Sequence, residues 1–230
     1  MADPNRALFE SVVRLLAPVL DELVFVGGCM TGILITDPAA EGIRPTRDVD
    51  AIVDVASYAR HTILADRLRN LGLAEDRSEG APTCRWRHGD VIIDVMPTDE
   101  RILGFSNRWY PMAIETAQSL QIAGRAVRIV TPALFIATKL EAFHGRGGDD
   151  VFLSHDLEDI VAVVDGRPAI VDDVIAAHEP VRAFIASEMR SLLDSPNFLE
   201  ALPGFLRPDA ASQARRPILE DRLRALSRIA

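Results

Sequence analysis

The chain has 230 residues, of which 48% are hydrophobic and 26% charged, as expected for a globular protein that buries a sizeable core. Its formal net charge of −9 argues against a protein that binds nucleic acid over its whole surface. No apolar stretch is long enough to cross a membrane, and the N-terminus lacks the basic and apolar regions of a signal peptide. These features predict a cytoplasmic protein without a membrane partner.

The first half of the chain mixes apolar residues at helical spacing with short alternating runs that are typical of strands. Gly89-Asp90 and Gly124-Arg125 each separate two such runs, which predicts two hairpins. In chain order, the expected elements are a helix over 5–17, a strand over 23–26, a short helix over 29–35, a strand over 48–55, a helix over 58–71, and four strands over 84–88, 91–96, 120–123 and 126–130.

The second half is predicted to be helical. Pro132 is favourable at the first position of a helix, which we expect to run to about His144. A further helix is expected over 153–164, and more helices with breaks at prolines follow it. The predicted fold class is therefore α/β (α+β), with a small mixed sheet over 1–130 and an all-helical C-terminal domain over 131–230.

One stretch combines two features that phosphate chemistry requires. Gly27 and Gly28 follow an apolar strand, so the backbone can turn tightly and approach a ligand, and the amides of the following helix favour an anion. Asp48 and Asp50 begin the next strand, where positions i and i+2 share one face within reach of a divalent ion. The combination predicts metal-assisted nucleotide transfer.

Two further acids lie near the predicted strand over 91–96. Asp90 lies in the predicted turn, whereas Asp94 lies inside a run of Val and Ile. A charge in such a strand is costly unless it is paired or bound to metal. Asp94 is therefore the acid of this region that needs a partner.

The glycine pair, the Asp-x-Asp pair and the later acid resemble the signature of the DNA polymerase β-like nucleotidyltransferase superfamily. The tract containing Lys139, Arg146, Asp156 and Asp159 resembles that of its AbiEii-type branch, many of whose members are toxins of toxin–antitoxin pairs. The resemblance implies a metal-dependent nucleotidyltransferase that uses Mg²⁺ (or Mn²⁺) and an NTP. It also implies an RNA acceptor, plausibly the 3′ end of tRNA, and a cognate antitoxin protein as a partner.

The resemblance implies a third metal ligand on a strand that neighbours the Asp48/Asp50 pair, and it assigns roles to individual residues. Asp48, Asp50 and Asp94 would bind the metal, and Asp94 would also help to deprotonate the acceptor. Gly27 and Gly28 would hold phosphates, with Thr31 as a further donor or as a residue that bonds back within its own helix. Lys139 would lie against the triphosphate. Arg146 would close over the ligand or be a solvated loop residue, and Asp159 would hold Lys139 or be a surface acid.

Two alternatives to this function remain. The acceptor could be a small molecule such as an antibiotic, or the chain could be a non-catalytic nucleotide-binding regulator. For an RNA acceptor, the arginines of the C-terminal 30 residues form the only region with a net positive count, and Arg215, Arg216 and Arg222 are the predicted RNA contacts. A solvated arginine-rich helix is the alternative interpretation of that region.

Overall fold

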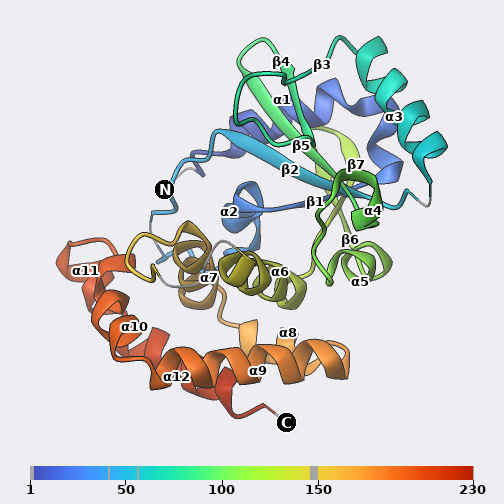
Figure 1. Cartoon of the computed structure of the whole chain (residues 1–230). Coiled ribbons are helices and arrows are strands. Elements are labelled where there is room, and N and C mark those ends of the chain that lie inside the picture. The colour runs from blue at the N-terminus through green and yellow to red at the C-terminus, as the bar shows by residue number, and fades with distance from the viewer. Residues whose placement is uncertain (1–2, 41, 56, 146–149, 230) are drawn as a thin grey trace. The chain divides into compact units, whose positions relative to one another are not determined.

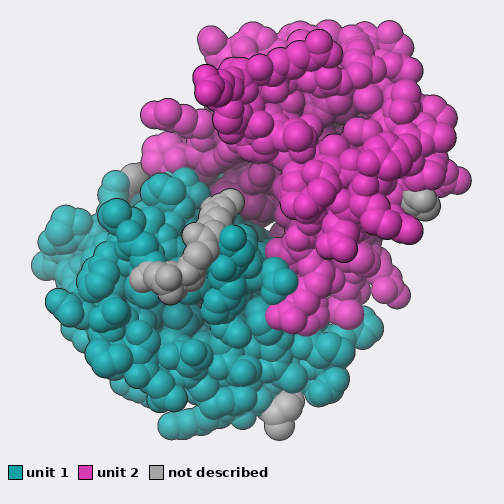
Figure 2. All heavy atoms as spheres, viewed as in Figure 1, with its two compact units in different colours: residues 1–3, 31–44, 132–230 teal, residues 4–30, 45–131 magenta. Residues whose placement is uncertain are grey.

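The computed structural model describes residues 3–40, 42–55, 57–145 and 150–229, and they form two compact units. The sheet unit contains residues 4–30 and 45–131, and the helical unit contains residues 1–3, 31–44 and 132–230 (Figure 2). Each unit is therefore assembled from separate stretches of the chain. Among the described residues, no helix is long and apolar enough to span a membrane, and both Cys29 and Cys84 are buried.

The sheet unit is built on a mixed seven-stranded sheet of order β3-β4-β5-β2-β1-β7-β6. β2 pairs in parallel with β5, and β1 pairs in parallel with β7, while the other neighbours are antiparallel. The strands are β1 (Leu23–Val26), β2 (Asp48–Val53), β3 (Ala74–Glu75), β4 (Arg85–His88), β5 (Val91–Pro97), β6 (Gln118–Ile122) and β7 (Arg125–Ile129). Both predicted hairpins, β4–β5 and β6–β7, are confirmed.

The helices of this unit follow the predicted pattern where the apolar spacing is strong. α1 packs Phe9 edge-on against Phe25 of β1, with ring centroids 5.0 Å apart, which anchors the strand next to the glycine turn. The helical segments are α1 (Arg6–Leu15), η1 (Ala17–Glu22), η2 (Gly28–Met30), α3 (Tyr58–Asn70), α4 (Glu100–Leu103) and α5 (Tyr110–Glu115). β3 and the two short helices α4 and α5 were not predicted, because each is too short to show a period.

The helical unit is organised around α6 (Pro132–Gly145), most of whose residues are buried. The other segments are α2 (Thr31–Leu34), α7 (His155–Gly166), α8 (Ile170–Ile175), α9 (Glu179–Asp194), α10 (Pro196–Ala201), η3 (Leu202–Phe205), α11 (Ala210–Gln213) and α12 (Arg216–Ser227) (Figure 1). The mixed fold class, with a small mixed sheet and a helical C-terminal part, is confirmed.

A close backbone contact joins residues 31–44 to the C-terminal helices. The carbonyl of Gly166 accepts hydrogen bonds from the amides of Thr36 and Asp37, each at 2.9 Å. A Cβ at Gly166 would lie only 2.7 Å from Cγ1 of Ile35, so glycine allows the end of α7 to approach this segment.

Candidate functional site

Three carboxylates share one face of the sheet. Asp50 of β2 lies directly beside Asp94 of the parallel strand β5, and Asp48 precedes Asp50 by two residues. Because side chains alternate along a strand and paired residues of parallel neighbours point the same way, all three lie on one face. The prediction that Asp94 stands on a strand next to the Asp48/Asp50 pair is confirmed. We call these three residues the acid face.

Gly27 makes room for one of these acids. Val26, the last residue of β1, pairs with Asp50, and Gly27 then turns with φ of +72°. A Cβ at Gly27 would lie 1.8 Å from Oδ2 of Asp50. Glycine is therefore required here twice, for the left-handed backbone and for the space that the Asp50 carboxylate fills.

The helix expected after the glycine pair is present as two short pieces, η2 and the four-residue α2. The amide of Met30 donates to the carbonyl of Gly27 at 3.0 Å, so this N–H is used within the turn. Such short segments contain few aligned peptide units, so their combined dipole is small. Any attraction for a phosphate at Gly28 would therefore come from single amides rather than from a helix dipole.

Thr31 follows the turn and is 1% exposed. Its hydroxyl makes no hydrogen bond to any residue that the structure describes. The alternative in which Thr31 bonds back within its helix is thus contradicted. A buried hydroxyl without a partner costs about 1–3 kcal/mol, and contact with a ligand is one way in which such a cost is recovered.

Arg85 of β4 contacts two members of the acid face. Its Nε and Nη2 donate to Oδ1 and Oδ2 of Asp94 at 2.9 and 2.7 Å, and Nη2 also lies 3.2 Å from Oδ2 of Asp48. The hydrogen bond to Asp94 is the largest influence on Arg85, and it raises the pKa of the guanidinium despite the opposing effect of burial. Asp48 is further held by the hydroxyl of Thr46, which donates to Oδ1 at 2.8 Å.

Arg85 was missed by the sequence analysis, although the sequence contains the information. A two-residue turn at Gly89-Asp90 pairs His88 with Val91, and counting outward along the hairpin places Arg85 opposite Asp94. Paired residues of an antiparallel hairpin point to the same side of the sheet. The predicted hairpin therefore also predicts this contact.

The donor chemistry of the acid face suits a divalent ion, since Mg²⁺ prefers carboxylate oxygens. Among the contacts of the described residues, Arg85 pairs with Asp94 and Asp48. The pKa of the neighbouring Cys84 thiol is raised to about 12, first by burial and then by the charge of Asp94. In the side-chain arrangement of the described residues, however, no three acidic, histidine or cysteine side chains form a ligand group for a metal.

Lys139 lies in a separate cluster within the helical unit. Its Nζ is 3.0 Å from Oδ1 of Asp156 and 2.7 Å from Oδ2 of Asp159, and Arg44 reaches the same Asp159 oxygen at 3.1 Å. The expected contact between Asp159 and Lys139 is present. We call Lys139, Arg44, Asp156 and Asp159 the lysine cluster.

The lysine cluster is closed. The side chains of Lys139, Asp156 and Asp159 are 11%, 3% and 2% exposed. Burial lowers the pKa of Lys139, but the charges of Asp159 and Asp156 outweigh it, so the pKa is raised. These ion pairs account for the buried ammonium without a nucleotide, and the contact between Lys139 and a triphosphate stays a prediction. Arg146 lies outside the described residues.

The arginines expected to bind RNA are largely engaged within the helical unit. Arg215 contacts Asp165 and Asp37 through Nε and Nη2, each at 2.8 Å, and its side chain is 12% exposed. Arg222 donates to the carbonyls of Val164 and Asp165. The prediction that Arg215 and Arg222 line a face open to RNA is therefore wrong, because both close the contact between α12 and α7.

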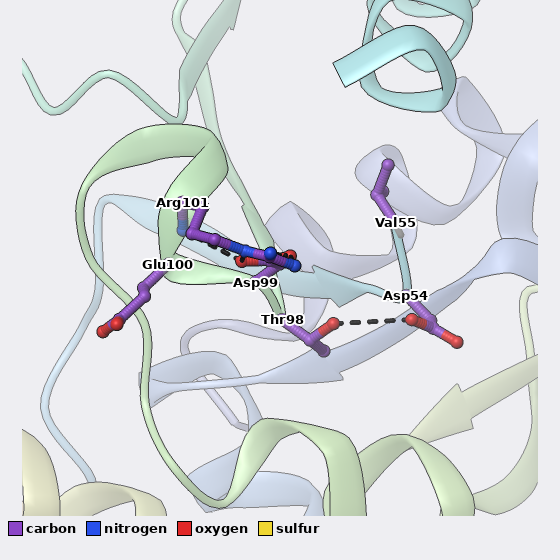
Figure 3. Close-up of a pocket in the computed structure, with 6 residues that line it drawn as sticks. All are labelled: Asp54, Val55, Thr98, Asp99, Glu100 and Arg101. Atoms are coloured by element: carbon purple, nitrogen blue, oxygen red, sulfur yellow. Dashed lines mark hydrogen bonds and ion pairs between the residues drawn. The ribbon is translucent and has the colours of Figure 1, made fainter. Parts of the chain in front are cut away.

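Figure 3 shows a shallow hollow lined by Asp54, Val55, Thr98, Asp99, Glu100 and Arg101. Asp54 and Thr98 follow the C-terminal ends of β2 and β5, whereas the acid face contains the first residues of β2. In the hollow, Arg101 pairs with Asp99 at 2.5 Å, and hydrogen bonds from Arg101 lower the pKa of Asp99 to about 2. Thr98 reaches Asp54 at 3.5 Å. Of the three acids in this hollow, Asp54, Asp99 and Glu100, Arg101 pairs with Asp99.

Comparisons with known proteins agree on the fold. No protein-family model matches the sequence, and no curated protein sequence matches it. The chain resembles the crystal structure of an antigenic nucleotidyltransferase-like protein from Paracoccidioides brasiliensis, with a TM-score of 0.52, 19% identity, and 85% of this chain and 92% of that one covered.

It also resembles the solution structure of the antibiotic-resistance factor ANT(2'')-Ia, with a TM-score of 0.50 and 17% identity. That comparison covers 82% of this chain and 96% of the other. At these identities the likeness concerns the architecture. The chain therefore has a nucleotidyltransferase-like fold.

Proposed function

We propose that the chain is a metal-dependent nucleotidyltransferase. The acceptor hydroxyl oxygen would form a bond to the α-phosphorus of an NTP. The bond between the α-phosphorus and the oxygen that bridges it to the β-phosphate would break, and pyrophosphate would leave. One observation carries the proposal: the parallel register of β2 and β5 brings Asp50 beside Asp94, with Asp48 on the same face. A bound Mg²⁺ or Mn²⁺ would neutralise charge on the phosphates and orient them.

The residues of the chain have distinct proposed roles. Asp48, Asp50 and Asp94 would hold the ion, and Asp94 would accept the proton of the acceptor hydroxyl. Gly27 keeps the space that the Asp50 carboxylate fills. The backbone at Gly28 and the hydroxyl of Thr31 would donate to phosphate oxygens.

Two observations favour a small acceptor molecule over RNA. Arg215 and Arg222, the expected RNA contacts, are occupied within the helical unit, and the chain carries a net charge of −9. A small hydroxyl-bearing acceptor needs no basic surface, whereas RNA binding relies on one. The tRNA 3′ end and the antitoxin partner implied by the AbiEii resemblance form the alternative.

The test supplies each of the four NTPs, labelled at the α-phosphate, with Mg²⁺ or Mn²⁺. One arm offers total RNA and the other a panel of hydroxyl-bearing small molecules that includes antibiotics. We expect metal-dependent transfer in the small-molecule arm, and none from a folded Asp48→Asn/Asp50→Asn double variant. Transfer to RNA would select the alternative acceptor, and metal-dependent NTP binding without transfer to anything would favour a non-catalytic regulator.

A further inference from the structure

One nitrogen of Arg85 occupies the place between two of the proposed metal ligands. Nη2 lies 2.7 Å from Oδ2 of Asp94 and 3.2 Å from Oδ2 of Asp48, and these acids come from neighbouring strands. A cation bound by oxygens from both strands would have to lie in the same region. The guanidinium of Arg85 thus stands where a divalent ion would make its contacts.

The geometry of this pairing is specific. Arg85 makes a bidentate contact with Asp94, which fixes the plane of the carboxylate and is among the strongest side-chain pairings. Both oxygens of Asp94 are engaged, and the side chain of Asp94 is only 9% exposed. In this arrangement both oxygens of Asp94 already face a cation, and no three-acid ligand group for a metal is present among the described residues.

We propose that Arg85 is an internal counter-cation that a divalent ion must displace from the acid face. This inference rests on the proposed function, since it takes the acid face to be the metal site. In the metal-free protein, Arg85 neutralises Asp94 and part of the charge of Asp48, and it permits an acid to be buried in the sheet. The ion and the guanidinium compete for the same carboxylate oxygens. Arg85 therefore lowers the affinity of the acid face for a divalent ion.

Arg87 provides a matched control on the same strand. It lies two residues after Arg85, on the same face of β4, but its Nε pairs with Asp76 at 2.6 Å. Loss of Arg87 therefore removes one arginine from the same strand without removing the contact to the acid face.

The experiment titrates Mn²⁺ into the parent, Arg85→Gln and Arg87→Gln, and measures free Mn²⁺ by electron paramagnetic resonance without nucleotide. We expect Arg85→Gln to bind Mn²⁺ about tenfold more tightly than the parent, and Arg87→Gln to bind like the parent. Equal affinity in the parent and Arg85→Gln would overturn the inference and leave the metal site intact. Weaker binding by Arg85→Gln would also overturn it, because Arg85 would then be orienting the acids for the ion.

Thermal unfolding gives a second measurement that a general loss of structure would not reproduce. Without metal, Arg85→Gln should melt below the parent, because Asp94 loses its partner. Saturating Mn²⁺ should raise the Tm of Arg85→Gln more than that of the parent, since the tighter ligand stabilises the folded state more. A smaller or equal rise would contradict the displacement. If neither protein binds Mn²⁺, the metal site and this inference both fail.

Discussion

The acid face and the lysine cluster are built from the same kinds of charged groups, and they differ in the exposure of their acids. On the acid face, Arg85 contacts Asp94 and Asp48. In the lysine cluster, Lys139 contacts Asp156 and Asp159, while Arg44 contacts Asp159 and lies 3.8 Å from Glu158. The side chains of Asp48 and Asp94 are 31% and 9% exposed and those of Asp156 and Asp159 are 3% and 2% exposed, whereas Arg85 and Arg44 are both 22% exposed.

This difference supports the proposed metal site on the acid face and a structural role for the lysine cluster. In the lysine cluster, Asp156 and Asp159 are buried and both pair with Lys139. Removing one member of such a cluster leaves a buried charge without compensation. On the acid face, Asp48 remains partly accessible, so a further cation can reach it. Four substitutions test this contrast.

The largest effect is expected from the acid face and concerns activity. Asp50→Asn should lower transfer at least a hundredfold, because a bound metal supplies several kcal/mol of charge stabilisation and each 1.36 kcal/mol corresponds to a factor of ten. Steady-state transfer measures this loss, and urea unfolding checks that the variant is folded. Transfer at the parental rate by the folded variant would remove Asp50 from the site.

The next largest effect concerns stability and comes from the lysine cluster. Lys139→Met keeps the volume but leaves two buried carboxylates, and it should cost about 3–5 kcal/mol in the free energy of unfolding. Lys139→Arg keeps the charge and is the control, with a smaller loss. Urea unfolding measures both variants. A loss below about 1 kcal/mol for Lys139→Met would mean that the cluster is not a closed structural element.

The pH dependence of the lysine cluster follows from the same contacts. The pKa of Lys139 in the folded protein is raised above its ordinary value of 10.5. Its contribution to stability is therefore fully present below that value, and it is lost only as the pH rises through the folded pKa. Between pH 7 and 9 this contribution should stay constant, which urea unfolding across that range can check.

A smaller effect is expected from Gly27→Ala. The left-handed backbone costs about 1–2 kcal/mol for a residue with a Cβ, and the new methyl would also displace the Asp50 carboxylate, which lies 1.8 Å from its position. Gly124→Ala is the matched control, because Gly124 has φ of +75° and no described atom within 4 Å of the place that its new methyl would take. Both variants should lose stability, but only Gly27→Ala should also weaken Mn²⁺ binding. Equal Mn²⁺ affinities would contradict the role of Gly27 in placing Asp50.

The smallest effect is expected from Thr31→Val. This substitution removes a buried hydroxyl that has no described partner, so stability should be unchanged or higher by about 1 kcal/mol. Thr138→Val is the control, since the Thr138 hydroxyl donates to the carbonyl of Phe135 at 3.0 Å, and it should lose stability. NTP affinity of Thr31→Val, measured by calorimetry, should fall. Unchanged NTP affinity would rule out the phosphate contact.

Much of the sheet unit could be predicted from sequence because its strands are short, apolar and separated by glycine turns. The strand over 23–26 and both hairpins have the expected positions, and Asp94 stood out as a charge among Val and Ile. The contact between Arg85 and Asp94 also follows from the hairpin register. The parallel pairing of β2 with β5 has no local pattern and was not predicted; the resemblance to a known family supplied only the expectation of an acid on a neighbouring strand.

Other contacts could not be predicted because they join distant parts of the chain. Arg44 and Asp159 are 115 residues apart in sequence, and no periodicity links them. The same holds for Arg215, whose partners Asp165 and Asp37 are 50 and 178 residues away in sequence. Net charge along the sequence therefore gave a wrong prediction for the C-terminal arginines, since it does not reveal which charges are already paired.

The most direct test of the central claim is a Mn²⁺ titration of three proteins without nucleotide, followed by electron paramagnetic resonance. The parent and Asp54→Asn should bind Mn²⁺ with equal affinity, because Asp54 follows the far end of β2 and lies in the separate hollow of Figure 3. Asp50→Asn should lose most of the binding. If Asp50→Asn binds Mn²⁺ as the parent does, or if Asp54→Asn loses binding equally, the acid face is not the cation site.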